Sequence, residues 1–208
     1  MQNPHNEKNS ATNSATHPYP DVTGVLLAGG KSRRMGRDKA LLEVFGEPMF
    51  RRTLRLLEDL FSTVVIAGDR PDLAPPGILA VADIYPGSAL GGLHTGLHSA
   101  TTEWIFVVPC DMPCPDPRIM RLLLQHREGF DAVVPRTAAG YEPVFALYHK
   151  NCLPHMEEML RHDQFRIYDF YQRIKIRYLD ETQLPEGWQK ALFNINTPED
   201  FNRIKKEQ

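Results

Sequence analysis

Short apolar runs alternate with longer amphipathic stretches along the chain. Three runs, Val22–Ala28, Thr63–Ala67 and Trp104–Val108, are mostly apolar, as is typical of strands buried on both faces of a parallel sheet. Shorter runs predict further strands at residues 78–82, 131–135, 144–148 and 173–179, and an extended segment at residues 40–44. The chain therefore offers many short strands separated by segments long enough to cross over the sheet.

Helical patterns occupy most of the stretches between these strands. Phe50, Leu54, Leu57 and Leu60 recur at helical spacing after Pro48, which suits the first turn of a helix. Further helices are predicted at residues 91–100, 117–127, 152–161 and 198–206, the last opened by Thr-Pro-Glu-Asp. The alternation predicts an α/β fold: a single-domain, Rossmann-like, mostly parallel sheet with helices on both faces.

The composition limits the class of protein further. At 208 residues the chain is long enough for one domain and marginal for two. Residues 1–20 are polar and rich in Asn, Ser, Thr and Pro, so we expect a disordered tail before a domain at residues 21–208. A net charge of −2 gives no basic excess for nucleic acid or a membrane surface. Without a membrane-length apolar run or a secretory signal, we expect a cytoplasmic protein.

The segment Leu27–Lys39 carries the strongest chemical signal. It reads LAGGKSRRMGRDK, with small residues directly after a buried strand and several cationic side chains after them. Small residues let backbone N–H groups approach a phosphate or a base, and fixed cations stabilise charge that develops during phosphoryl transfer. The segment is not a P-loop, because Val25 stands where that motif requires glycine. Taken alone, it also fits a glycine-rich connector with solvated charges.

Two carboxylates follow other predicted strands. Asp83 precedes a flexible Pro-Gly segment, where an acid can bind a sugar hydroxyl or a base edge. Asp111 lies between two prolines and suits Mg²⁺, which takes one or two carboxylates together with phosphate oxygens and water. Each also has a plainer interpretation as the cap of a turn. The eight histidines and three cysteines show no metal-binding spacing, and we assign them no such role.

Two side-chain amides, Asn194 and Asn196, stand just before the last predicted helix. We expect residues 193–197 to form a strand whose amides hydrogen-bond a polar heterocycle or a sugar at the edge of the sheet. As loop amides they would instead satisfy backbone groups. Ligands of such sheets bind at the carboxyl ends of the strands, where the basic segment, Asp83 and Asp111 are all expected. We therefore predict one crevice with a basic turn facing a carboxylate.

Together these motifs resemble the molybdenum cofactor guanylyltransferase family. The family's opening L-A-G-G-x-S-x-R-M-G-x-D-K matches residues 27–39, its C-D-x-P matches residues 110–113, and its N-x-N-T-P-E matches residues 194–199. Residues 83–93 resemble its acid-then-Pro-Gly segment, although Ser88 and Ala89 stand where Gly-Pro is frequent. Ala67-Gly68-Asp69 also replaces an asparagine found in some members. The resemblance extends from about Val22 to the C-terminus.

The resemblance implies a Mg²⁺-dependent transfer of GMP from GTP to the phosphate of molybdopterin cofactor, with release of pyrophosphate. The cofactor's phosphate would attack the α-phosphorus directly, without a covalent enzyme intermediate or a general base. Molybdoenzyme apoproteins or other proteins of cofactor biosynthesis are candidate further partners. By resemblance the site residues are Leu27, Ala28, Gly29, Gly30 and Asp83 for the nucleotide, Arg34 and Lys39 for phosphates, Asp111 for Mg²⁺, and Asn194 and Asn196 for the pterin.

Gly29 favours the guanylyl branch, because related cytidylyltransferases usually have alanine there and a methyl group would stand where a purine must pass. Two alternatives remain open from the sequence. One is a cytidylyltransferase or sugar-phosphate nucleotidyltransferase that uses CTP or UTP. The other is a nucleotide-binding cofactor chaperone without turnover, against which the presence of both Lys39 and Asp111 argues.

Overall fold

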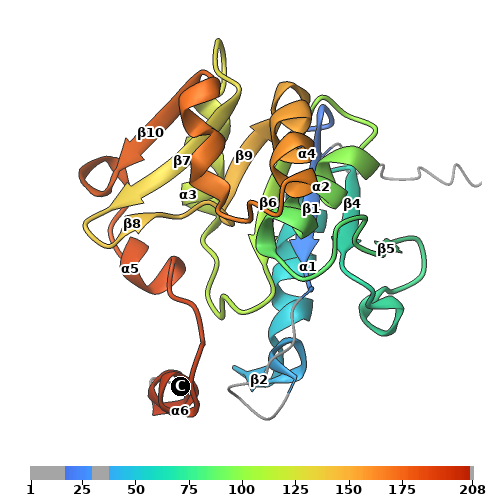
Figure 1. The fold of residues 1–208 in the computed structure, drawn as a ribbon. Coiled ribbons are helices and arrows are strands. Elements are labelled where there is room, and N and C mark those ends of the chain that lie inside the picture. The colour runs from blue at the N-terminus through green and yellow to red at the C-terminus, as the bar shows by residue number, and fades with distance from the viewer. Residues whose placement is uncertain (1–16, 30–37, 207–208) are drawn as a thin grey trace, which may run out of the picture.

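The computed structural model describes residues 17–29 and 38–206. The strands are β1 (Val22–Leu27), β2 (Glu43–Val44), β3 (Glu47–Pro48), β4 (Thr63–Ala67), β5 (Leu79–Val81), β6 (Trp104–Pro109), β7 (Ala132–Thr137), β8 (Gly140–Tyr141), β9 (Ala146–His149) and β10 (Ile176–Asp180). The helices are α1 (Met49–Leu60), α2 (Ala89–Ser99), α3 (Pro117–Gln125), α4 (Leu153–Arg161), α5 (Trp188–Ala191) and α6 (Pro198–Lys206). Figure 1 shows their arrangement.

The central sheet has the strand order β10-β7-β9-β6-β1-β4-β5, with β8 paired to β7. Neighbours are parallel except at β9, which runs antiparallel to both β6 and β7, and at β8. The prediction of a mostly parallel α/β sheet is therefore confirmed. Strand β9 reverses direction because residues 138–145 are too few to cross over the sheet, whereas a tight turn can join antiparallel strands.

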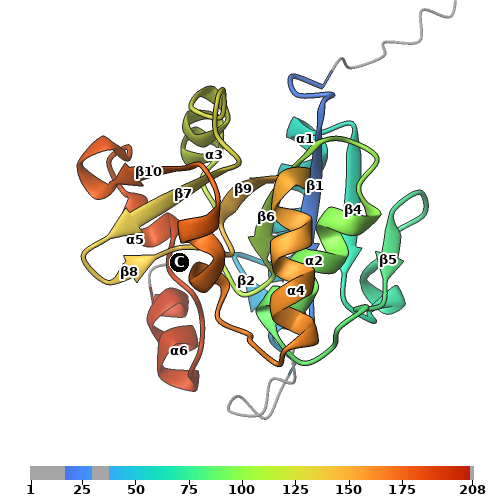
Figure 2. The same cartoon turned by 45° about the horizontal axis from the view of Figure 1, so that its top comes forward.

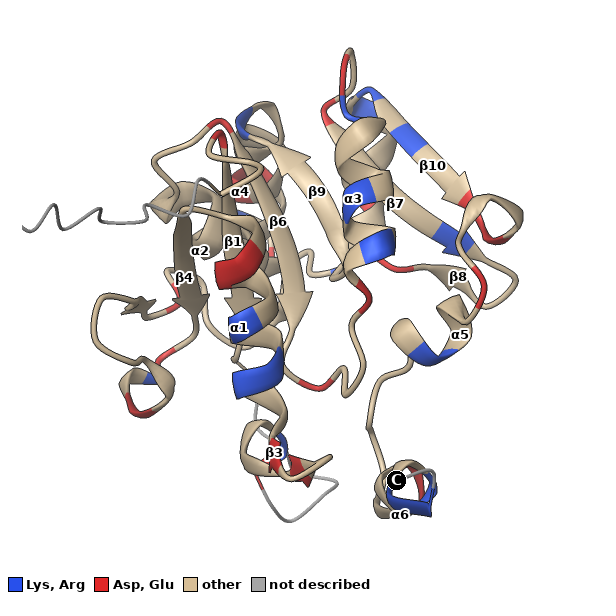
Figure 3. Cartoon of the chain, turned by 180° about the vertical axis from the view of Figure 1, so that it is seen from behind, with Lys and Arg blue, Asp and Glu red and all other residues tan. Residues whose placement is uncertain are grey.

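Helices cover both faces of the sheet, as predicted. Figure 1 shows α2 and α4 in front of it, and Figure 3, drawn from behind, shows α1 and α3 over the other face. The strands β1, β4 and β6 are almost wholly buried between these layers, which explains their uniform apolar sequences. The outer faces of α1 and α3 carry the charged side chains, so amphipathic spacing marks these two helices.

The C-terminal segment packs away from the main sheet. Ile195 and Ile204 of this segment join Leu42, Val44 and Met49 in a small separate apolar cluster. In Figure 2, α6 lies apart from the helices that cover the sheet. This cluster holds the end of the chain beside the residues that follow the basic segment.

Several predicted boundaries need correction. Residues 39–41 form a 3-10 turn rather than the start of an extended segment, because the Asp38 carboxylate accepts the Ala40 N–H and caps the turn. The predicted tail at residues 1–20 lies mostly outside the described residues, but Tyr19 already packs on Phe61 with ring centroids 6.3 Å apart. Among the described helices, none is long and apolar enough to span a membrane.

Candidate functional site

Lys39 lies where three distant segments of the chain meet. Its Nζ donates to Asp111 Oδ2 at 3.2 Å and to Asn196 Oδ1 at 2.8 Å. Lys39 ends the basic segment, Asp111 follows β6, and Asn196 precedes α6. The side chains of the ion pair are 17% and 23% exposed, so both charges are only partly accessible to water. The predicted meeting of a basic segment and a strand-end carboxylate is thus present at Lys39.

Asp38, the residue before Lys39, is held by a second ion pair. Asp38 accepts the Ala40 N–H through Oδ1 and pairs with Arg70 at 2.8 Å through Oδ2. Hydrogen bonds from Arg70 to Asp72, and then to Asp38, raise the pKa of the guanidinium further above its ordinary value, so it stays charged. Arg70 comes from the connection after β4 and therefore ties the end of the basic segment to the sheet.

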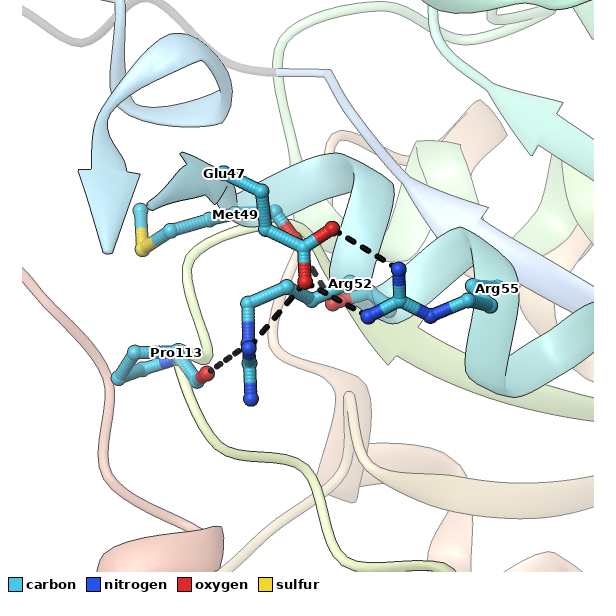
Figure 4. Close-up of polar contacts among 6 residues, drawn as sticks. Glu47, Met49, Arg52, Arg55 and Pro113 are labelled. Atoms are coloured by element: carbon cyan, nitrogen blue, oxygen red, sulfur yellow. Dashed lines mark hydrogen bonds and ion pairs between the residues drawn. The ribbon is translucent and has the colours of Figure 1, made fainter. Parts of the chain in front are cut away.

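Arg52 on α1 fixes the loop that carries Asp111. Figure 4 shows Arg52 between Glu47 and the loop. Its Nε donates to the Pro113 carbonyl at 3.2 Å, and its Nη1 donates to Glu47 Oε1 at 3.2 Å. Glu47 is in turn held by Arg55 through both carboxylate oxygens. The Asp111 loop is thereby anchored to the start of α1.

A pocket of about 620 Å³ opens at the carboxyl ends of β1 and β6, and we call it the sheet-edge pocket. Its lining is Leu27, Gly29, Asp83, Gly87, Ser88, Ala89, Gly92, Pro109, Cys110, Asp111, Val144, Asn194 and Asn196. The volume lies within the range of small-molecule sites. It is placed where ligands of doubly wound sheets bind.

Asp83 lies against the first glycine of the basic segment. A Cβ on Gly29 would stand 3.0 Å from Asp83 Oδ2, so alanine would press on this carboxylate. The sequence predicts that a methyl group here obstructs a purine, whereas the atom nearest to such a group in the structure belongs to Asp83. Among the described residues, the buried Asp83 Oδ1 has no hydrogen-bond partner, and desolvation raises the pKa of the carboxyl. Asp83 is therefore a carboxylate that a ligand with hydrogen-bond donors would stabilise.

Gly68 makes the approach of these segments possible. It has a φ of +127°, and a Cβ there would lie 2.7 Å from the backbone nitrogen of Gly29. Both the conformation and the contact exclude a side chain. Gly68 of the Ala67-Gly68-Asp69 sequence therefore supports the backbone of the basic segment directly.

Residues 193–197 are not a strand, contrary to the prediction. The Ile195 N–H donates to the Asp111 carbonyl at 2.9 Å, while the Asp200 carboxylate accepts the N–H groups of Asn196 and Thr197. Capture by the helix cap leaves these donors unavailable to a sheet neighbour. The amides still reach the site: both line the sheet-edge pocket, and the buried Asn194 Oδ1 has no partner among the described residues.

The structure brings most of the predicted site residues together. Leu27, Gly29, Asp83, Asp111, Asn194 and Asn196 line one pocket, and Lys39 contacts two of them. Ala28 differs, because it is only 5% exposed and packs in the apolar cluster beneath α1, so only its backbone is available to a ligand. Gly30 and Arg34 lie outside the described residues.

Sequence reasoning missed Arg52, Arg70 and Glu142. The two arginines act through contacts with residues far away in sequence, and no local motif marks them. Glu142 precedes Pro143 in the turn between β8 and β9, where an acidic residue is unremarkable. Burial nevertheless raises the pKa of its carboxyl to about 7.

The oxygen atoms around Asp111 are candidate ligands for Mg²⁺. No group of three or more His, Cys, Asp or Glu side chains within the described ranges could hold a metal by itself. Mg²⁺ does not require one, since it commonly binds one carboxylate together with substrate phosphates and water. Asp111 and Asn194, whose buried Oδ1 has no partner among the described residues, line the same pocket and offer oxygen atoms of the kind that such a site uses.

Cys110 also faces the pocket, but its chemistry argues against a covalent role. Desolvation is the main cause that raises the pKa of this thiol to about 12, so it stays protonated at neutral pH. A protonated thiol is a poor nucleophile. His94 and His98, which stack on each other along α2, lie outside the pocket lining.

Gly29 after β1, a lysine paired with a strand-end aspartate, and a pocket at the carboxyl edge of a mostly parallel sheet suit a nucleotidyltransferase. Comparison with known proteins agrees. The MobA-like NTP transferase domain matches residues 24–176. The chain therefore belongs to the MobA-like NTP transferase family and is a nucleotidyltransferase.

Relatives with assigned names cover nearly the whole chain. It is 40% identical to a probable molybdenum cofactor guanylyltransferase of Pelotomaculum thermopropionicum, across 88% of this chain and 92% of that protein. It is 33% identical to the molybdenum cofactor guanylyltransferase of Vibrio atlanticus, across 86% and 93%. Among solved structures, molybdopterin-guanine dinucleotide biosynthesis protein A of Archaeoglobus fulgidus superimposes with a TM-score of 0.77 at 23% identity, covering 89% and 97% of the two chains. That structure supports the fold.

Proposed function

We propose that this protein is a molybdenum cofactor guanylyltransferase, which transfers GMP from GTP to the terminal phosphate of molybdopterin cofactor and releases pyrophosphate. The observation that carries the proposal is the contact of Lys39 with Asp111 at the rim of a pocket lined by Gly29 and Asp83. The choice of substrates rests on the names of the relatives, which match over 85% of the chain.

In this proposal the sheet-edge pocket receives the guanine nucleotide. Asp83 offers an unpartnered acceptor to the adjacent N1–H and 2-amino donors of guanine, and Gly29 leaves the space for that approach. Cytosine lacks this pair of adjacent donors, so the carboxylate discriminates between the two bases. Leu27 supplies apolar contact to the ring from the end of β1.

The phosphates would lie along Lys39 and the basic segment. The Lys39 ammonium, held between Asp111 and Asn196, is placed to exchange those contacts for phosphate oxygens. Arg34 would contribute charge from the same segment. Such fixed charges stabilise the negative charge that develops at the α-phosphorus. Mg²⁺ bound at Asp111 would neutralise charge on the triphosphate.

The chemical step requires positioning and no proton transfer. An oxygen of the molybdopterin phosphate forms a bond to the α-phosphorus, and the bond from that phosphorus to the bridging oxygen breaks as pyrophosphate leaves. The nucleophile is ionised at neutral pH, so no general base is needed. Asn194 and Asn196 would orient the acceptor, because both line the wall of the pocket near Asp111. Catalysis then follows from alignment of the two substrates.

Calorimetric titration with GTP, CTP, UTP and ATP in the presence of Mg²⁺ tests the nucleotide assignment. We expect GTP to bind at least about tenfold more tightly than the other nucleotides, because one bidentate pair of hydrogen bonds gives discrimination of about this size. Lys39→Ala should weaken GTP binding while leaving the preference among bases intact. Preference for CTP or UTP would instead support the sugar-phosphate or cytidylyl alternatives, and an unchanged Kd for GTP in Lys39→Ala would refute the role of Lys39.

A further inference from the structure

A second hollow of about 520 Å³ adjoins the sheet-edge pocket, and we call it the neighbouring pocket. Asn194 and Asn196 line both, so the two pockets share a wall. The rest of its lining includes Glu142, Trp188 and Phe193, which combine an acid with aromatic side chains. The two pockets are therefore adjacent, as the sites of the two substrates of a transfer reaction must be.

Three carboxylates border the neighbouring pocket, and two are already engaged. Glu181 Oε2 accepts the Ala138 N–H at 3.0 Å, and Asp200 Oδ2 accepts two backbone N–H groups at 2.9 Å. The Glu142 carboxylate receives no hydrogen bond and no ion pair from the residues that the structure describes. It is half-buried, and burial alone raises its pKa to about 7. Such an acceptor is stabilised by a ligand that brings its own donors.

We propose that Glu142 selects the pterin of the acceptor substrate, by accepting hydrogen bonds from its N3–H and its 2-amino group. This inference rests on the proposed function. The 2-amino-4-oxopyrimidine edge of a pterin carries two adjacent donors that match the two oxygens of one carboxylate. The aromatic side chains of Trp188 and Phe193 give the same pocket apolar surface for a flat ring.

Guanine carries the same edge as a pterin. The protein thus has one unpartnered carboxylate for each ring: Asp83 in the sheet-edge pocket and Glu142 in the neighbouring pocket. Desolvation raises the pKa of both carboxyl groups. Two similar heterocycles are then bound by two similar acceptors in pockets that share Asn194 and Asn196.

The test compares a pterin with its lumazine analogue, in which an oxygen replaces the 2-amino group. The probes are 6-hydroxymethylpterin phosphate and 6-hydroxymethyllumazine phosphate, titrated by fluorescence against the GTP-loaded protein. The natural protein should prefer the pterin by at least about tenfold, since the lumazine oxygen opposes the carboxylate. Glu142→Gln should lose or reverse this preference, because the glutamine amide donates to that oxygen.

Glu128→Gln is the matched control, because Glu128 lines a separate hollow beside the start of β6 and the substitution is chemically the same. It should keep the natural preference. Failure of the natural protein to prefer the pterin, or retention of that preference in Glu142→Gln, would overturn the role of Glu142. An unfolding midpoint and a Kd for GTP close to those of the natural protein would show that the Glu142→Gln protein is folded.

Turnover separates this inference from the function on which it rests. With GTP and molybdopterin, Glu142→Gln should raise KM for molybdopterin at least about tenfold while kcat stays within about twofold. A change confined to kcat would contradict substrate selection. If the natural protein forms no guanylylated product, the proposed function fails, whereas the pterin preference is still decided by the binding experiment.

Discussion

The ion pair of Lys39 with Asp111 joins opposite charges at the rim of the sheet-edge pocket. Both side chains are partly exposed, and pairs of this kind contribute only about 0–1 kcal/mol to stability. The Lys39–Asp111 contact therefore explains little of why the chain folds. Its position explains function better, since a cation and a metal-binding carboxylate converge on the space where phosphates are proposed to lie.

Replacement of Asp111 separates these two roles. Asp111→Ala should lower the rate of guanylyl transfer by at least about 10³-fold, because the proposed metal site is lost. The midpoint of thermal unfolding should change by no more than a few degrees. Asp59→Ala, on the exposed face of α1, is the control and should retain full activity. Natural turnover by Asp111→Ala with Mg²⁺ present would show that this carboxylate is not the metal ligand.

Glu142 should make stability depend on pH. Its pKa is about 7 in the folded protein against 4.5 ordinarily, so the folded state binds the proton more tightly than the unfolded chain does. The contribution of this group to stability is thus complete below pH 4.5 and is lost as pH rises through 7. The neighbouring Glu181 and Asp200 carboxylates accept backbone hydrogen bonds, and those made to Asp200 help to lower the pKa of its carboxyl.

Glu142→Gln should therefore stabilise the ligand-free protein above neutral pH. The undiminished shift corresponds to roughly 3 kcal/mol, and solvent screening of this half-exposed group reduces the expected gain to about 1–2 kcal/mol at pH 8. Urea unfolding at a series of pH values measures it. The gain should shrink towards zero as the pH approaches 4.5. A gain that does not vary with pH would mean that ionisation of Glu142 is not its origin.

At the scale of elements, α1 connects the two halves of the site. It begins directly after the β2–β3 hairpin, and its Arg52 holds the carbonyl of Pro113, two residues beyond Asp111. The guanidinium also lies 4.9 Å from the Phe45 ring. The helix thus sets the distance between the loop that carries Asp111 and the hairpin that follows Lys39.

Arg52→Ala tests this connection. We expect kcat to fall about tenfold, because a small displacement of a catalytic group is costly, with a loss of stability of about 1 kcal/mol. Arg51→Ala changes the adjacent exposed arginine and should leave kcat unaltered. Equal effects of both substitutions on kcat would indicate that the overall charge of α1 matters and that the Pro113 contact does not.

The elements also show why sequence patterns succeed or fail. Strands buried on both faces, such as β1 and β4, were predicted almost to the residue, because burial alone determines their composition. The segment at residues 193–197 was predicted wrongly as a strand. Its apolar and amide residues look extended, but the backbone donors are taken by Asp111 and Asp200, which no local pattern reveals.

For the whole molecule, the connection from motif to site follows from sheet topology. Asp83 and Asp111 follow different strands, yet parallel strands bring their carboxyl ends to one edge, so their proximity could be predicted. The roles of Arg52, Arg70 and Glu142 could not, because each depends on a contact or an enclosure made by segments far apart in sequence. The antiparallel β9 was also unpredictable from composition, although the short preceding connection accounts for it.

The C-terminal segment contributes the last residues of the site. Asn194 and Asn196 reach the site because Ile195 and Ile204 anchor the segment in the small apolar cluster beside Met49. Residues from the first, middle and last parts of the chain therefore surround one pair of adjoining pockets. This arrangement suits a reaction that must align two large anionic substrates.

Pyrophosphate release, followed with purified protein, GTP, Mg²⁺ and molybdopterin, tests this account most directly. We predict continuous release that requires all three additions, accompanied by a product whose mass equals that of molybdopterin joined to GMP. Release at the same rate without molybdopterin, or with CTP in place of GTP, would contradict the account.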